Sequence, residues 1–344
     1  MSEISDASVA LPDFLEEHRK NLSPKLTFAD WQGSFASWRE AAMALWRDAL
    51  PPFETTAKGE CLPTSERFGA SHRLTFATGA QSEAILCLPE KGTPPYPAII
   101  LMHDHGGVFD IGWKKLFRRD EATALQQKFY DGQSPASHFL ERGFAVFSMD
   151  ALGWGSRFCG GYESQQALAA NAMGLGYSLA GLVAAEDCEA ARWLADHPRI
   201  DARRIGTFGF SFGGFRAWQL AALCPEVRAL ASLSWLACRK DLMVATAPLL
   251  RGQSAYYFLY PQLAGALDFP DMAGLGAGKP MLFRSGSGDR HMPLASVQTA
   301  WEKVSRICNA GGGPLPDHAL HDKGHTCPSD CLVEAVDFLE HRLS

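Results

Sequence analysis

The sequence feature that most constrains the fold is a glycine-flanked serine within residues 204–214, which read RIGTFGFSFGG. Gly209, Ser211 and Gly213 match the pattern G-x-S-x-G, in which a serine occupies a strained turn between a strand and a helix. Glycine is needed on both sides because a side chain there would collide with the neighbouring strand or helix. The apolar residues before Ser211 predict the strand, and those from Phe212 to Leu220 predict the helix. We therefore expect a serine exposed at the end of a sheet strand, beside the positive end of a helix.

Other apolar runs predict the rest of this sheet. Two segments flank Gly79-Ala80 and indicate a β-hairpin, at residues 73–78 and 82–88. Continuous apolar runs, typical of strands buried on both faces, follow at residues 97–102, 144–149, 227–236 and 280–284. Helices are expected at residues 179–196, from beyond Asp289 to about 307, and at 328–343, with a last extended segment at 318–320 before the final helix. This alternation predicts an α/β fold with a mostly parallel central sheet that helices flank.

The N-terminal part of the chain has a different pattern. From Trp31 to Trp46 the apolar positions follow a helical stripe that includes three tryptophans. We expect these rings to clamp the segment onto the main body; a ligand-binding role is the alternative. The chain then divides into a helical N-terminal extension at residues 1–65, packed on the core, and a main domain at residues 66–344. Within the main domain, the glycine- and alanine-rich residues 160–177 are expected to be an insertion rather than a core element.

Charge and composition exclude several classes of function. A net charge of −6 offers no basic surface for nucleic acid. The N-terminus has no apolar stretch of the kind found in signal peptides, and no apolar run approaches the roughly 20 residues of a membrane span. Nine cysteines, an odd number without paired C-x-x-C spacing, are typical of reduced thiols. We therefore expect a cytoplasmic protein with no nucleic-acid or membrane partner, and the oligomeric state stays open.

A serine hydroxyl becomes a nucleophile only with a base to take its proton and an acid to orient that base. His325, in KGHT between the last predicted strand and helix, is the expected base. Asp289, in GSGD just after the preceding strand, is the expected acid, because the order Ser211, Asp289, His325 is typical of this turn. The rival bases and acids are His318, His321, Asp187 and Asp317.

Backbone donors for an oxyanion are expected from two places. One is the N–H of Phe212, and the other is an N–H of the loop HDHGG that follows the strand at 97–102, at His105 or Gly106. Glycines in this loop let the backbone approach a substrate oxygen closely. His103, Asp104 and His105 also permit a metal hypothesis, but no third ligand cluster with known spacing joins them. We expect no metal and no cofactor.

Five segments together resemble the α/β-hydrolase superfamily, and within it the branch of dienelactone hydrolases and acetyl-xylan-esterase-like proteins. These segments are HDHGG, MDALGWGSR, LADHPRIDARRIGTFGFSFGG, GSGDRHMP and KGHTCP, and the likeness covers about residues 70–344. The resemblance implies Ser211 as nucleophile, Asp289 as acid and His325 as base, with Phe212 and the His105 region as oxyanion donors. Many relatives have His-Gly where this chain has His103-Asp104, so the second donor stays open between His105 and Gly106. Dienelactone hydrolases often use cysteine as nucleophile, so the serine favours the esterase side.

The expected activity is that of a serine hydrolase cleaving carboxylic esters of small molecules, with acetyl and other short-acyl esters, carbohydrate esters included, as substrates. The alternatives are a lactone hydrolase of the dienelactone type and a peptidase of the prolyl-oligopeptidase kind. A third alternative is an inactive hydrolase fold that only binds. Three aromatic residues in loops are expected to line the substrate pocket, or else to be ordinary packing: Trp113, Trp154 and Tyr162.

Overall fold

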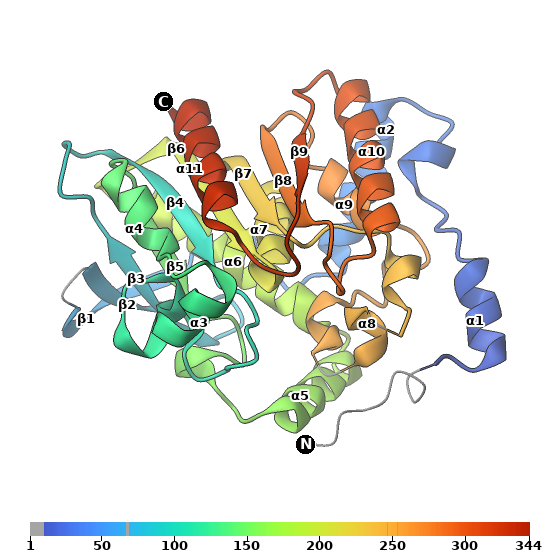
Figure 1. Ribbon diagram of the computed structural model, residues 1–344, viewed down its shortest axis with the longest axis horizontal. Helices are drawn as coiled ribbons and strands as arrows, with labels where there is room; N and C mark the ends of the chain where they lie inside the picture. Colours follow the sequence, from blue (N-terminus) through green and yellow to red (C-terminus); the bar gives the residue numbers. More distant parts are fainter. Residues whose placement is uncertain (1–9, 67–68, 246, 253) are drawn as a thin grey trace.

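The computed structural model describes residues 10–66, 69–245, 247–252 and 254–344. Within them lies one sheet with the strand order β1-β2-β3-β5-β4-β6-β7-β8-β9 (Figure 1). The strands are β1 (Lys58–Glu66), β2 (Gly69–Thr75), β3 (Gln81–Cys87), β4 (Tyr96–Met102), β5 (Ala145–Met149), β6 (Ile200–Phe210), β7 (Val227–Leu233), β8 (Met281–Gly286) and β9 (Asp317–His321). Strands β1, β2, β3 and β5 pair antiparallel, and every pairing from β5 to β9 is parallel. The hairpin and the mostly parallel sheet predicted from the sequence are both confirmed.

Helices cover both faces of this sheet. The α-helices of the described residues are α1 (Asp13–Lys20), α2 (Phe35–Asp48), α3 (Thr123–Phe129), α4 (Pro135–Glu141), α5 (Tyr162–Gly174), α6 (Leu179–Ala195), α7 (Phe212–Leu223), α8 (Pro248–Arg251), α9 (Phe269–Gly274), α10 (Leu294–Ala310) and α11 (Ser329–Leu343). Side chains of β4 alternate between two apolar clusters, with Ile100 in one and Ile99 in the other. The first cluster contains residues of α2, α6, α7, α9 and α10, and the second contains residues of α4 and α11. Because both faces are apolar, the central strands read as continuous hydrophobic runs.

The N-terminal arm packs on the main body through its tryptophans. Trp38 and Trp46 lie on α2 and are fully buried, and the Trp46 ring meets those of Trp218 on α7 and Tyr260. Trp31 precedes the helix and donates from Nε1 to Ser37 Oγ. The expected division after residue 65 falls inside β1, which pairs with β2 from Lys58 onward, so the sheet begins earlier than the sequence suggested. An edge strand carries only a weak alternating signal, which explains the misplaced boundary.

Residues 160–177, expected to be an insertion rather than a core element, consist mostly of the helix α5. Its interior is rich in alanine and glutamine, which favour helix, and its glycines lie at its ends. Gln165, Ala169 and Ala172 turn inward and are buried. Between 237 and 279, the described residues (all but 246 and 253) form short helical turns separated by irregular stretches. In the described part of the chain no single helix is long and apolar enough to cross a membrane; α5 and α6 together pass on length and composition, but they meet at 86°.

Candidate active site

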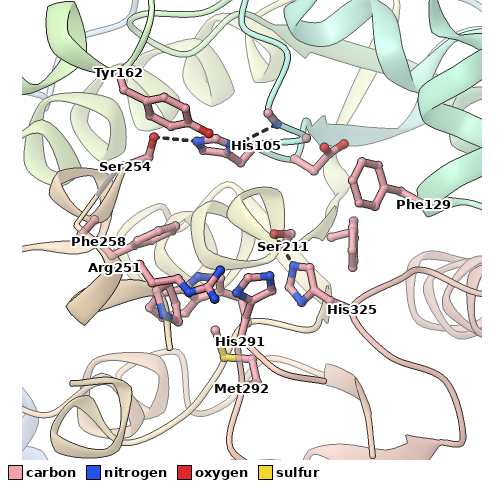
Figure 2. A pocket seen from close by; sticks show the side chains of 17 residues that line it. His105, Phe129, Tyr162, Ser211, Arg251, Ser254, Phe258, His291, Met292 and His325 are labelled. Atoms are coloured by element: carbon pink, nitrogen blue, oxygen red, sulfur yellow. Dashed lines mark hydrogen bonds between the residues drawn. The ribbon is translucent and has the colours of Figure 1, made fainter. Parts of the chain in front are cut away.

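Three loops at one edge of the sheet carry the residues predicted to act in catalysis. Ser211 follows β6, Asp289 follows β8 and His325 follows β9, and parallel strands bring their carboxyl ends to the same edge. The Nε2 atom of His325 lies 2.8 Å from Ser211 Oγ, and its Nδ1 atom lies 2.7 Å from Asp289 Oδ2. Figure 2 shows Ser211 and His325 facing each other at the centre of a pocket. The structure therefore joins the three residues in one hydrogen-bonded chain.

The direction of these hydrogen bonds assigns the protons. A carboxylate can only accept, so Nδ1 of His325 carries a proton and donates it to Asp289. The Nε2 atom of the neutral ring is then bare and accepts from the Ser211 hydroxyl. Asp289 is itself held by the backbone N–H of His291, which donates to Oδ1 over 2.8 Å, and its side chain is fully buried. This is the arrangement in which a histidine can take the serine proton.

The turn that carries Ser211 is strained and tightly enclosed. Ser211 has φ 55° and ψ −124°, a conformation that costs a non-glycine residue about 1–3 kcal/mol. A Cβ atom at Gly209 would lie 2.1 Å from the Gly213 carbonyl oxygen, and one at Gly213 would lie 2.0 Å from that of Met102. Both glycines of the motif are thus required by backbone contacts. The Ser211 N–H, which donates to the Leu233 carbonyl over 2.9 Å, helps to hold the turn in place.

Two groups of backbone amides lie beside the serine. Phe212 begins α7, so its N–H belongs to the first turn of the helix, whose amides lack partners within the helix. The loop after β4 lines the same cavity, and the N–H groups of His105 and Gly106 donate to no atom in the described residues. Gly106 has φ 62°, a left-handed conformation that glycine adopts readily. Both candidates for the second oxyanion donor are therefore still available.

The histidines of this loop are neutral, and their ring nitrogens are in use. His103 is fully buried, and burial lowers its pKa well below the usual value; Nδ1 donates to the Asp104 carbonyl while Nε2 accepts from the Ala151 N–H. Burial also lowers the pKa of His105 to about 4. Its Nδ1 accepts from the Gly107 N–H, so Nε2 carries the proton and donates to Ser254 Oγ over 2.6 Å. Neither ring keeps a lone pair for a metal, which argues against the metal hypothesis.

A cavity of about 290 Å³ opens in front of Ser211. In Figure 2, Tyr162, His105 and Ser254 form one wall, and His291, Met292 and Arg251 face them across the serine. Burial lowers the pKa of His291 to about 4, so its ring is neutral, and it lies 4.7 Å from the His325 ring between centroids. The cavity is lined by Asp104, His105, Gly106, Gly107, Phe129, Tyr162, Phe210, Ser211, Trp235, Pro248, Arg251, Ser254, Ala255, Phe258, His291, Met292 and His325.

Of the three aromatic residues expected in the pocket, only Tyr162 lines it. Trp113 is buried on the other side of the loop, edge-on to Phe117 in the second apolar cluster. Trp154 is fully buried and stacks on the Phe212 ring at 5.0 Å, behind the oxyanion donors rather than in the cavity. Of the two alternatives left open by the sequence, packing therefore applies to both tryptophans. Loop position alone could not distinguish a ring that faces a cavity from one that faces the core.

The rival acids and bases are engaged elsewhere. Asp187 forms a bidentate ion pair with Arg216, at 2.7 and 2.9 Å, within the core. Asp317 pairs with Arg284 at 3.0 Å, and the ring of His318 stacks on Trp301. The remaining rival, His321, makes no hydrogen bond to the Ser211 hydroxyl, whose partner among the described residues is His325.

Several lining residues were not predicted from the sequence. Arg251, Ser254 and Phe258 come from the irregular segment at residues 237–279, where no periodic pattern reveals which side chains turn inward. His291 had a signal, since it lies two residues after the predicted acid in GSGDRHMP. A histidine so close to Asp289 in the chain had to lie near the same site.

Comparisons with known proteins give a family and a relative for this chain. Residues 79–258 match the family described as X-Pro dipeptidyl-peptidase (S15 family). The chain is 26% identical over 265 residues to the protein named "Putative hydrolase YtaP" of Bacillus subtilis (strain 168), covering 76% of this chain and 83% of that one.

Solved structures share the fold at low sequence identity. A glucuronoyl esterase from Solibacter usitatus is 15% identical, with a TM-score of 0.65 over 93% of this chain and 97% of that one. Acetyl Xylan Esterase 1 from Thermoanaerobacterium sp. JW/SL YS485 is also 15% identical, with a TM-score of 0.54 over 97% and 99%. These likenesses confirm the α/β-hydrolase fold that the sequence resembles.

Proposed function

The chain belongs to the X-Pro dipeptidyl-peptidase (S15) family, and from that premise we propose that it is a serine hydrolase that cleaves carboxylic esters of small molecules. The observation that carries the proposal is a pair of hydrogen bonds: one of 2.8 Å between Ser211 and His325, and one of 2.7 Å between His325 and the buried Asp289. Such a hydrogen-bonded triad converts a hydroxyl into a nucleophile without any further group.

The proposed reaction has two halves. Ser211 Oγ attacks the ester carbonyl carbon while its proton passes to His325 Nε2, and the carbonyl oxygen becomes an oxyanion facing the N–H of Phe212 and those of the loop after β4. The tetrahedral intermediate collapses, the bond to the alcohol breaks, and His325 gives its proton to the leaving oxygen. Water then attacks the acyl-enzyme by the same steps and releases the acid. Throughout, Asp289 keeps Nδ1 protonated and stabilises the imidazolium.

Peptide cleavage is the second candidate, because the family description names a dipeptidyl-peptidase. An enzyme that releases a dipeptide from a peptide N-terminus must bind the free α-ammonium group, which needs an anionic partner. Asp104 is the single carboxylate among the described lining residues, and Lys115 and Tyr130 already occupy it. Arg251 on the opposite wall carries the same charge as the ammonium. The pocket therefore favours a neutral ester over a peptide N-terminus.

The cavity also supports a short acyl group. At about 290 Å³ it lies at the lower end of the range for small-molecule sites, roughly 300–1,000 Å³, and it must hold the acyl and the alcohol parts together. We therefore expect acetyl esters, including acetylated sugars, to be better substrates than octanoyl esters.

The test is a panel of p-nitrophenyl esters of increasing chain length beside Gly-Pro-p-nitroanilide, with Ser211→Ala as control. We expect kcat/KM to fall steeply from acetyl to octanoyl and the anilide to be a poor substrate. Ser211→Ala should lose activity by several orders of magnitude and also lose labelling by a fluorophosphonate. Retention of more than about a tenth of the activity by Ser211→Ala would disprove the assignment of the nucleophile. Preference for the anilide would select the peptidase instead.

A further inference from the structure

A lysine is buried directly beneath the loop that follows β4. Lys115 lies in the 3-10 turn Gly112–Leu116, and its side chain has no solvent exposure. Its Nζ atom donates to the carbonyl oxygen of Asp104 over 2.9 Å and to that of His105 over 3.1 Å. The Asp104 Oδ2 atom lies 3.7 Å away, an ion-pair distance too long for a hydrogen bond. The charge of this buried ammonium is thus directed at two consecutive backbone carbonyls.

Those two carbonyls belong to the peptide groups whose amides are the candidate oxyanion donors. The Asp104 carbonyl shares a planar peptide with the N–H of His105, and the His105 carbonyl shares one with the N–H of Gly106. In a trans peptide the C=O and N–H bonds point in opposite directions. A cation that gathers both carbonyls on one side therefore turns both N–H groups to the other side. There they donate to no atom of the described residues, while the loop lines the cavity in front of Ser211.

We propose that Lys115 is a positioning residue of the oxyanion hole, which orients and polarises the peptides of His105 and Gly106 so that their N–H groups meet the developing charge. The inference rests on the proposed function and adds a residue to it. A positive charge on a carbonyl oxygen withdraws electrons from the same amide and makes its N–H a stronger donor in a region of low dielectric. Donors fixed in advance need no reorganisation as the oxyanion forms.

The surroundings hold Lys115 in this place. Asp150, at the end of β5, accepts from the N–H of Trp113 over 2.8 Å and so anchors the turn that carries the lysine. Tyr130 donates to Asp104 Oδ1 over 2.6 Å, so the carboxylate has a second partner that does not contact the two carbonyls. A Cβ atom at Gly106 would lie 2.7 Å from Asp104 Oδ2 and 3.1 Å from Lys115 Nζ, so glycine is needed where the loop passes over the pair.

The ion pair could instead serve the fold alone, and the kinetics distinguish the two roles. The test compares Lys115→Met, which keeps the length of the side chain and removes the charge, with Tyr130→Phe. Tyr130→Phe removes the other partner of the same buried carboxylate but leaves both carbonyl contacts intact. Two rates are measured: turnover of p-nitrophenyl acetate and the second-order rate of labelling by a fluorophosphonate. Both reactions place a negative oxygen in the same hole.

Loss of one oxyanion donor costs about 10²–10³ in kcat, so loss of its support should cost about 10- to 100-fold. We expect Lys115→Met to lower kcat and the labelling rate by that factor with KM within about threefold. Tyr130→Phe should keep both rates within about threefold. If Lys115→Met is folded and both rates equal those of the unaltered protein, or if Tyr130→Phe loses as much, the proposal is wrong.

Two further outcomes are a Lys115→Met variant that does not fold and an unaltered protein that is inactive. Removal of one partner of a buried pair can unfold a protein, whereas replacement of both is better tolerated. If Lys115→Met does not fold, the charge-balanced Lys115→Met/Asp104→Asn variant is measured instead, and unaltered rates there would also overturn the proposal. If the unaltered protein is neither labelled nor active on any ester, the proposed function itself is wrong, and the role of Lys115, which rests on it, falls with it.

Discussion

Two buried aspartates should respond in opposite ways to the same substitution. Asp187 and Arg216 are each about 1% exposed and form a bidentate pair, so Asp187→Asn leaves a buried guanidinium without its counter-charge. Breaking such a pair costs about 3–5 kcal/mol. At about 2.1 cal/mol/K of unfolding entropy per residue, a chain of 344 residues should lose about 4–7 °C in Tm. Because Asp187 does not touch His325, kcat should stay within about tenfold.

Asp289→Asn should show the reverse. The amide can donate to Nδ1 of His325 and so favour the tautomer that cannot accept the serine proton, which lowers kcat by about 10⁴. Its hydrogen bond from the His291 N–H can be kept, so Tm should fall by less than about 2 °C.

Thermal unfolding and ester turnover are measured on both variants, with Asp317→Asn as an exposed control that should change neither. A severe kinetic loss in folded Asp187→Asn, or mild kinetics in Asp289→Asn, would refute the assignment of the acid. The variant Asp187→Leu/Arg216→Met should recover much of the lost stability, since it leaves no unpaired charge.

Two further outcomes are expected. Gly213→Ala should lower the free energy of unfolding by about 3 kcal/mol or more, because its Cβ would lie 2.0 Å from the Met102 carbonyl oxygen. Gly174→Ala, with no atom within 4 Å of the added Cβ, should leave that free energy nearly unchanged. Urea titration of both variants measures the difference. Burial lowers the pKa of His291 from 6.5 to about 4, so between these pH values the unfolded chain binds more protons than the folded one. The contribution of the neutral His291 ring to folding stability is therefore lost as the pH falls from 6.5 to about 4. His291→Gln should remove that loss, which is at most about 3 kcal/mol. As the pH falls from 7 to 4, the Tm of the variant should therefore decrease less than the Tm of the unaltered protein. If the two Tm profiles are parallel, the pKa of His291 is not lowered. Asp150, whose pKa burial raises to about 6, changes stability in the opposite direction over part of the same range, so only the difference between the two proteins isolates His291.

Features set by local pattern were predictable from the sequence. The turn around Ser211 follows from its glycines, since backbone atoms at 2.0 and 2.1 Å exclude any other residue there. Strands buried on both faces appear as continuous apolar runs, so the parallel sheet followed directly. Once those strands were assigned, Asp289 and His325 had to lie at the carboxyl edge with Ser211, because each comes directly after a parallel strand.

Other features depend on how distant segments pack, and no local pattern encodes them. Trp113 and Trp154 occupy loops beside the site, yet both rings pack in the apolar core. The lining of the cavity is completed by three residues of an irregular segment, Arg251, Ser254 and Phe258. The extent of β1 was missed because an edge strand is defined by its partner rather than by its own residues. In the sequence, Lys115 is one of two adjacent lysines, and nothing local distinguishes it from Lys114. Only the tertiary structure buries it against the carbonyls of Asp104 and His105, because that contact requires the turn at Gly112–Leu116 to fold back under the loop after β4.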